Sequence, residues 1–131
     1  VVGVFVGRLA VTEPPLRVAD EGLVAGGQLA EALDHELAGG QTPIRIGFSF
    51  RSQSGYCRTF QMEAARLGGF ACREGRSWRV AMTAPINPSD AEYRMASSST
   101  PTAVLAAVDE LMVGEALDRE QEAAARRQRW R

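Results

Sequence analysis

Apolar and polar residues alternate through the middle of the chain with the period of antiparallel β-strands. In the first such segment Ile44, Ile46, Phe48 and Phe50 alternate with Arg45, Gly47, Ser49 and Arg51, as in a half-buried strand. Three further segments are rich in β-favouring residues, and turn signals or a short connection separate each from the next. The four segments are 44–51, 56–62, 67–73 and 78–83. Four strands joined by short loops predict an antiparallel meander.

The two cysteines lie on neighbouring strands of this meander. If Met62 faces Leu67 across their connection, the antiparallel register places Cys57 directly opposite Cys72. Opposed Cβ atoms lie within the range that a disulfide needs, and closing a loop of about 15 residues stabilises a domain by roughly 3 kcal/mol in the chain-entropy treatment. The alternative is two reduced, buried thiols that pack as small apolar groups. The even count and the aligned register favour the disulfide.

A helical pattern precedes the meander, over residues 21–37. Leu29, Leu33 and Leu37 recur at a spacing of four and form one narrow apolar stripe. Asp20 is the expected N-cap, Gly26-Gly27 interrupts the pattern, and a glycine pair at 39–40 ends it.

A second helix is predicted after an irregular, Pro- and Ser-rich segment at 85–99. Thr100 is its expected cap, Pro101 suits its first position, and Gly114 ends it. Its apolar residues are expected to be buried. They are Val104, Leu105, Val108, Leu111 and Met112.

A final helix is predicted over residues 115–129, with Leu117 as its main apolar anchor. Its carboxylates come first and Arg126, Arg127 and Arg129 come last, which complements the helix macrodipole. A patch that binds phosphate or lipid headgroups is the alternative interpretation of these arginines.

The chain begins with an apolar segment at 1–11, followed by a Thr-Glu-Pro-Pro linker. Eleven residues are too few to span a bilayer, which needs about 20. The segment is therefore either the end of a membrane helix or an ordinary buried element. We divide the chain into this segment and linker at 1–19 and one α+β domain at 20–131. In that domain a four-stranded antiparallel meander packs against an N-terminal helix and two C-terminal helices.

Composition and spacing exclude several classes of function. The net charge is −1, whereas a nucleic-acid-binding domain needs a basic face. All fifteen basic residues are arginines, as is typical of GC-rich genomes. Two cysteines without CxxC spacing and a single histidine cannot complete a tetrahedral metal shell. His35 lies between Asp34 and Glu36, but no motif places a nucleophile beside it, so a solvated helix face is favoured over an acid–base pair. We expect no catalytic residue, metal or cofactor.

One cluster on the meander is a candidate binding surface. Tyr56, Arg58, Arg73 and Trp78 lie on adjacent strands, where guanidinium groups can stack on the indole ring. The cluster is either a ligand or partner patch or a simple cover for the sheet.

Three segments together carry a resemblance to a known family. They are SFRSQSGYCRTFQM, LGGFACREGRSWRV and VDELMVGEALDREQEAAARRQRW. The combination resembles the C-terminal region of membrane-anchored anti-sigma factors of GC-rich proteobacteria, over about residues 22–131. The residues that carry it are Phe50, Arg51, Tyr56, Cys57, Arg58, Phe60, Ala71, Cys72, Arg73, Trp78, Gly114, Leu117 and Trp130. The YCR…ACR…W core is also similar to that of bacterial surface antigens that are outer-membrane lipoproteins.

The resemblance implies a non-catalytic sensory or regulatory domain in the periplasm, attached to the inner membrane by an upstream helix and controlling sigma-factor release. The sigma factor would bind a cytoplasmic N-terminal domain, since this sequence contains no HxxxCxxC-type zinc motif. Self-association is a further option, and a disulfide is compatible with an oxidising periplasm. The alternative function is structural, as the domain of an envelope lipoprotein related to the surface antigens.

Overall fold

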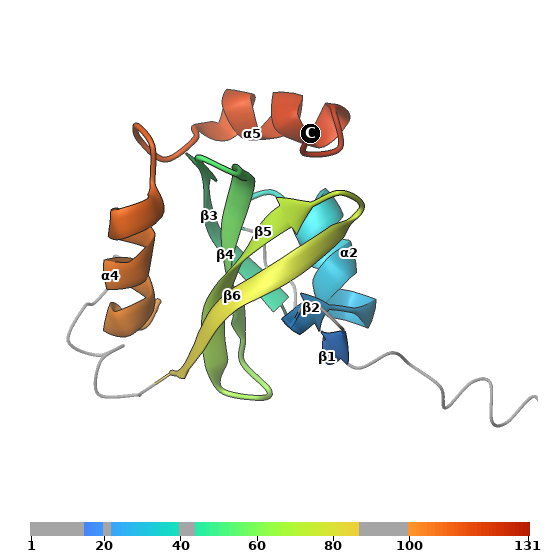
Figure 1. Ribbon diagram of the computed structural model, residues 1–131, viewed down its shortest axis with the longest axis vertical. Coiled ribbons are helices and arrows are strands. Elements are labelled where there is room, and N and C mark those ends of the chain that lie inside the picture. The colour runs from blue at the N-terminus through green and yellow to red at the C-terminus, as the bar shows by residue number, and fades with distance from the viewer. Residues whose placement is uncertain (1–14, 20–21, 40–43, 87–99) are drawn as a thin grey trace, which may run out of the picture.

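The computed structural model describes residues 15–19, 22–39, 44–86 and 100–131, and shows an α+β fold (Figure 1). Its strands are β1 (Leu16–Ala19), β2 (Gly22–Ala25), β3 (Ile44–Ser52), β4 (Gly55–Met62), β5 (Leu67–Glu74) and β6 (Ser77–Pro85). Its helices are α2 (Gly27–His35), α4 (Thr102–Leu111) and α5 (Arg119–Arg127). The six strands form one antiparallel sheet in the order β1-β2-β6-β5-β4-β3.

The predicted four-stranded meander is confirmed as β3 to β6. Met62 faces Leu67 and Cys57 faces Cys72, as the short connection between β4 and β5 requires. The sheet is larger than expected because a hairpin of β1 and β2 adds two strands beside β6, with Val24 opposite Arg79.

The hairpin replaces the first half of the helix predicted at 21–37, so that prediction was wrong in its extent. The helix begins at Gly27, with Gly26 rather than Asp20 at its N-cap, and Asp20 lies outside the described residues. Each glycine in a helix interior costs about 1 kcal/mol relative to alanine, whereas the segment before Gly26 can pair with the open edge of β6. Leu29 and Leu33 of the predicted stripe are fully buried, but the helix ends at His35, so Leu37 lies beyond it and is only partly buried.

A β-bulge in β3 changes which side chains share a face of the sheet. Ile46 pairs with Phe60 but Ser49 pairs with Arg58, so two residues of β3 oppose the single residue Thr59. The Phe48 N–H donates to Thr59 Oγ1 at 2.9 Å inside the bulge. The expectation that Ile46, Phe48 and Phe50 share one apolar face was therefore wrong.

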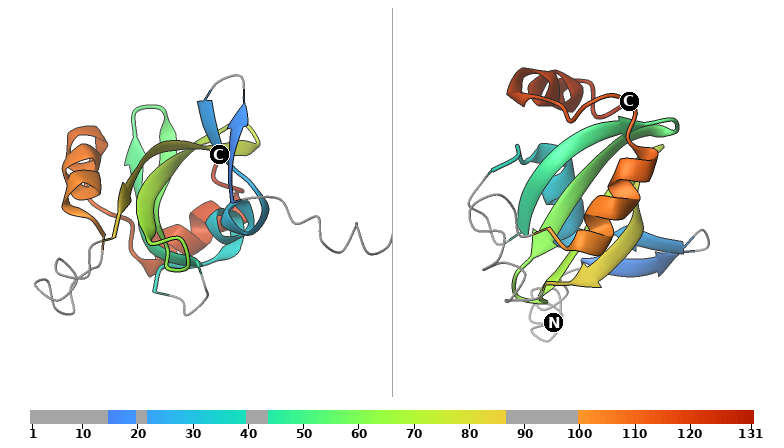
Figure 2. Two further views of the ribbon diagram at one scale, coloured as in Figure 1. Left: turned by 90° about the horizontal axis from the view of Figure 1, so that it is seen from below. Right: turned by 90° about the vertical axis from the view of Figure 1, so that its left-hand side faces the viewer.

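The two faces of the sheet carry separate cores. On one face α2 and the C-terminal residues Ala125 and Trp130 pack over Ile46, Phe60 and Trp78. On the other face α4 packs with Val104 and Val108 over Phe50, Phe70 and Cys57. Figure 2 shows α4 along one side of the sheet and α5 across its end.

Both C-terminal helices are shorter than predicted. Helix α4 begins after Pro101 without a side-chain cap, and Thr100 is buried, where its Oγ1 accepts a hydrogen bond from Gln61 Nε2 at 3.3 Å. The helix ends at Leu111, which is 45% exposed rather than buried, and Leu105 and Met112 are only partly buried.

The segment between the two helices is extended along the edge of β3 and was not expected to be. The Val113 N–H donates to Arg51 O and the Leu117 N–H donates to Ser49 O, both at 2.8 Å. These bonds provide donors for two backbone carbonyls of the edge strand β3. Helix α5 therefore begins only after its N-cap residue, Asp118. The Asp118 side chain and Gln121 then form a capping box.

No helix within the described ranges is both long and apolar enough to span a bilayer. The apolar segment at 1–11 and nearly all of the irregular segment at 85–99 lie outside the described residues.

Candidate functional site

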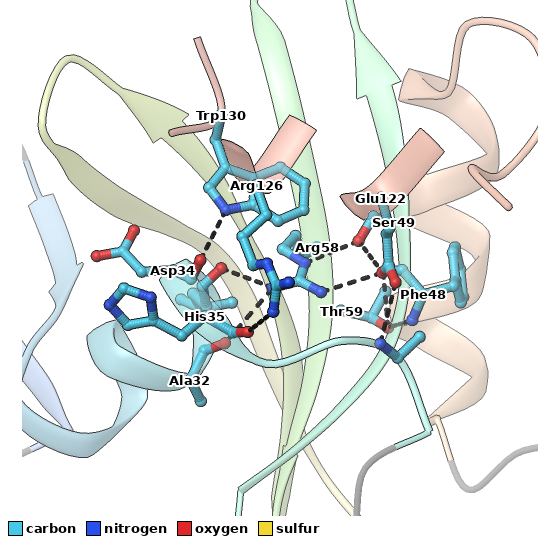
Figure 3. Close-up of polar contacts among 12 residues, drawn as sticks. Ala32, Asp34, His35, Phe48, Ser49, Arg58, Thr59, Glu122, Arg126 and Trp130 are labelled. Atoms are coloured by element: carbon cyan, nitrogen blue, oxygen red, sulfur yellow. Dashed lines mark hydrogen bonds and ion pairs between the residues drawn. The ribbon is translucent and has the colours of Figure 1, made fainter. Parts of the chain in front are cut away.

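Arg58 is a fully buried arginine at the centre of the face that α2 and α5 cover. Its Nε donates to Ser49 Oγ at 2.7 Å, and its two terminal nitrogens donate to Leu33 O at 2.6 Å and Glu122 Oε2 at 3.0 Å. The Trp130 ring lies 4.3 Å from the Arg58 guanidinium carbon, in cation–π geometry. Figure 3 shows the side chains of Ser49, Arg58, Glu122 and Trp130 converging from β3, β4 and the C-terminal segment beside the end of α2.

Glu122 supplies the charge that balances Arg58. Its carboxylate is 3% exposed and also accepts from Ser49 Oγ and from the Ala38 N–H. Burial lowers the pKa of the Arg58 guanidinium, and the Glu122 carboxylate opposes that shift. Through these hydrogen bonds the pair therefore joins three distant parts of the chain: strands β3 and β4, the end of α2, and α5.

The C-terminal end of α2 is capped by side chains from elsewhere in the fold. The last carbonyls of a helix have no partner within the helix. Here Arg58 binds Leu33 O, Trp130 Nε1 donates to Asp34 O at 3.1 Å, and Arg126 donates to His35 O at 3.0 Å. Two of these donors are cations, which complements the negative end of the helix dipole.

The Asp34 side chain makes a second link between α2 and the sheet. Its Oδ1 accepts from Arg73 at 2.7 Å and from Trp78 Nε1 at 2.8 Å. The carboxylate is therefore bonded to β5 and β6 rather than to the neighbouring His35, which is exposed.

A cleft opens at the surface beside these contacts, where the end of α2, the β5–β6 turn and the C-terminal residues meet. Its volume is about 560 Å³. A smaller hollow of about 380 Å³ continues it toward the β3–β4 turn, and both are lined by Arg73, Arg76, Trp130 and Arg131. We call the two together the arginine cleft. Its arginines are Arg73, Arg76, Arg126, Arg127, Arg129 and Arg131.

The four residues predicted as a binding patch lie together, but mainly in the interior. Arg58 and Trp78 are buried, and Tyr56 and Arg73 are partly buried. The expected stacking of Arg73 on Trp78 is present at 5.4 Å, whereas Arg58 stacks on Trp130 instead. Of the four, only Arg73 lines the arginine cleft.

The sequence patterns did not predict Ser49 and Glu122 as partners of Arg58. Ser49 was missed because of the bulge in β3. Strict alternation would place its side chain on the face of the sheet that does not carry Ile46 and Phe50. A signal for a buried arginine was present, since Arg58 falls between Tyr56 and Phe60 on the core face of β4. Its counter-ion, Glu122, could not be identified from periodicity because α5 carries many charged residues.

The Cys57–Cys72 disulfide is present and joins β4 to β5 on the α4 face. In the described part of the chain no three His, Cys, Asp or Glu side chains gather as a metal site. Comparison of the chain with family models, with curated proteins and with solved structures gives no match.

Proposed function

We propose that this chain is a non-catalytic sensory or regulatory domain of a membrane-bound anti-sigma factor, placed in the periplasm, where it controls release of the sigma factor. The sigma factor itself would bind a cytoplasmic domain upstream of this chain. An upstream helix would anchor the protein in the inner membrane.

One observation carries this proposal: residues that bear the resemblance in three separate segments contact one another. Tyr56 and Trp130 meet edge to face with ring centroids 5.7 Å apart, and Trp130 meets Trp78 in the same way at 5.7 Å. Arg58 stacks on Trp130. Motif residues spread over much of the chain thus act as one structural unit, which supports a family signature over a chance similarity.

The disulfide adds independent support for the compartment. Disulfides persist in oxidising compartments such as the bacterial periplasm and are rare in the cytosol. Cys57 is fully buried and Cys72 is partly buried between the sheet and α4, which suits a structural bond.

The alternative is a structural domain of an envelope lipoprotein. The YCR…ACR…W core that favours it lies entirely on β4, β5 and β6, so a domain could keep these strands without any regulatory role.

The coding region immediately upstream of Val1 gives the first test. A membrane helix preceded by a His- and Cys-containing cytoplasmic domain would support the anti-sigma proposal. A signal peptide that ends at a lipid-acceptor cysteine would support the lipoprotein alternative and contradict the proposal.

A cellular experiment then tests regulation. The full-length protein carries Trp130→Ala, with Leu111→Ala as the control because that side chain is already half exposed. We expect Trp130→Ala to change expression of a sigma-dependent reporter at equal membrane levels of protein, while the control does not. Unchanged reporter output with Trp130→Ala would contradict the proposal.

A further inference from the structure

The arginine cleft carries an excess of positive charge that the chain as a whole does not have. Six arginine side chains line it against one side-chain carboxylate, that of Asp34, which leaves a side-chain charge of about five positive units in a chain whose net charge is −1. Asp34 is already bonded to Arg73 and Trp78.

Five of the six arginines have no ion-pair partner among the residues that the structure describes. They are Arg76, Arg126, Arg127, Arg129 and Arg131, and of these Arg126 donates a hydrogen bond to His35 O. Elsewhere in the described structure Arg17, Arg51, Arg66 and Arg119 also lack an ion-pair partner, but they are spread over separate elements. The cleft differs because its unpaired arginines gather in one place.

The helix macrodipole is too weak to account for this cluster. The C-terminal end of a helix corresponds to about half a negative charge. Helices α2 and α5 both end beside the cleft. Their two dipoles together correspond to about one negative charge, against five positive ones. In addition, Arg73 and Arg76 belong to β5 and the β5–β6 turn rather than to α5.

The fold holds the arginines together at some cost. Arg129 and Trp130 both have left-handed backbone conformations, with φ of 60° and 62°, which non-glycine residues adopt reluctantly. The turn they form buries Trp130 while Arg129 and Arg131 line the cleft. The buried Trp130 ring thus fixes the backbone on either side of it, which keeps Arg129 and Arg131 at the cleft without a ligand.

From this geometry we propose that the arginine cleft binds an anion carrying at least two phosphate groups. Guanidinium groups present paired N–H donors that match phosphate oxygens, and charge-assisted bonds of this kind are the stronger ones. The main hollow and its extension toward the β3–β4 turn give room for more than one phosphate group. The source is either a soluble phosphorylated molecule or the headgroups of an anionic lipid surface.

The test uses two probes on the 131-residue chain. Isothermal titration with inorganic pyrophosphate measures the soluble source, and flotation with phosphatidylcholine vesicles, with or without phosphatidylglycerol, measures the headgroup source. One variant combines Arg76→Gln with Arg127→Gln, because both side chains are exposed and unpaired in the described structure. The matched control combines Arg17→Gln with Arg119→Gln, which removes the same charge from exposed positions outside the cleft.

We expect binding in at least one arm, weakened about tenfold or more by the cleft pair and by less than about twofold by the control. Pyrophosphate binding identifies a soluble source, and vesicle binding that requires phosphatidylglycerol identifies headgroups. Absence of binding in both arms, or equal weakening by both pairs, would overturn the proposal. Because binding is measured on this chain alone, the result does not depend on any link to a sigma factor.

Discussion

The Arg58 guanidinium and the Glu122 carboxylate lie 3.0 Å apart in the interior, although 64 residues separate them in the sequence. Removing one member of a buried ion pair leaves an uncompensated charge, which costs about 3–5 kcal/mol. We therefore expect Glu122→Gln to lower the free energy of unfolding by about 3 kcal/mol in urea denaturation. Glu120→Gln is the control on the same helix, and its exposed side chain should change stability by less than about 0.5 kcal/mol.

The same pair gives a double-mutant test. Replacing both members by apolar residues removes the uncompensated charge together with its partner, and such replacements are often close to neutral. The combination of Arg58→Met and Glu122→Leu should thus cost less than the two single changes added together. Strict additivity would show that the two side chains do not stabilise each other.

Trp130 is the main anchor of the C-terminal segment. Its ring is 1% exposed, contacts Tyr56, Trp78 and Arg58, and donates to Asp34 O. Trp130→Ala should lower stability by about 3–5 kcal/mol. Hydrogen exchange should accelerate more in α5 than in β4 and β5, because the helix has few other buried contacts.

Trp130→Phe tests the contribution of the aromatic ring apart from that of the Nε1 hydrogen bond. Phenylalanine keeps an aromatic face for Arg58 but loses the hydrogen bond to Asp34 O, so the expected loss is only about 1–2 kcal/mol. If both substitutions left α5 as protected from exchange as the parent chain, Trp130 would not be the anchor.

The meander was readable from the sequence because its strands pair through short local turns. Alternation and turn residues place Cys57 opposite Cys72 without any tertiary information, and this register is present. The β1–β2 hairpin was missed because the stripe that includes Leu29 suggested a longer helix. The helix starts only at Gly27 because the residues before it form β2, which pairs with β6 through a long-range contact.

The site was harder to predict because it is assembled from distant segments. Arg58 falls on the core face of β4, but Glu122 has the pattern of a surface residue, and only packing of α5 over the sheet makes the two partners. The bulge in β3 opposite Thr59, which turns Ser49 toward Arg58, also has no periodic signal. By contrast, the arginines of the last helical turn were visible, although their joining with Arg73 and Arg76 was not.

The Cys57–Cys72 disulfide closes a separation of 15 residues within the sheet. The chain-entropy treatment gives about 3 kcal/mol for such a loop, which corresponds to roughly 10 °C in melting temperature for a domain of this size. We expect Cys57→Ser combined with Cys72→Ser to lower the melting temperature by about that amount. Adding a reductant should lower that of the parent chain and leave the double variant unchanged. A reductant-insensitive parent that melts with the variant would contradict the stabilising role.

Helix α5 ends in a Schellman motif with an arginine where glycine is usual. The Arg129 N–H donates to Arg126 O at 2.9 Å and the Trp130 N–H donates to Ala125 O at 2.8 Å, while Arg129 has a φ of 60°. Glycine adopts this conformation freely, whereas an L side chain pays about 1 kcal/mol or more. Arg129→Gly should therefore raise the free energy of unfolding by about 0.5–1 kcal/mol, after the greater entropy of glycine in the unfolded chain is subtracted.

The matched control for this substitution is Arg127→Gly, which removes the same side chain from the last turn of the helix itself. Glycine within a helix costs about 1 kcal/mol, so this change should lower stability while Arg129→Gly raises it. Opposite signs in thermal denaturation would locate the strain in the backbone of Arg129. Equal losses would instead mean that the Arg129 side chain stabilises the fold by more than its conformation costs.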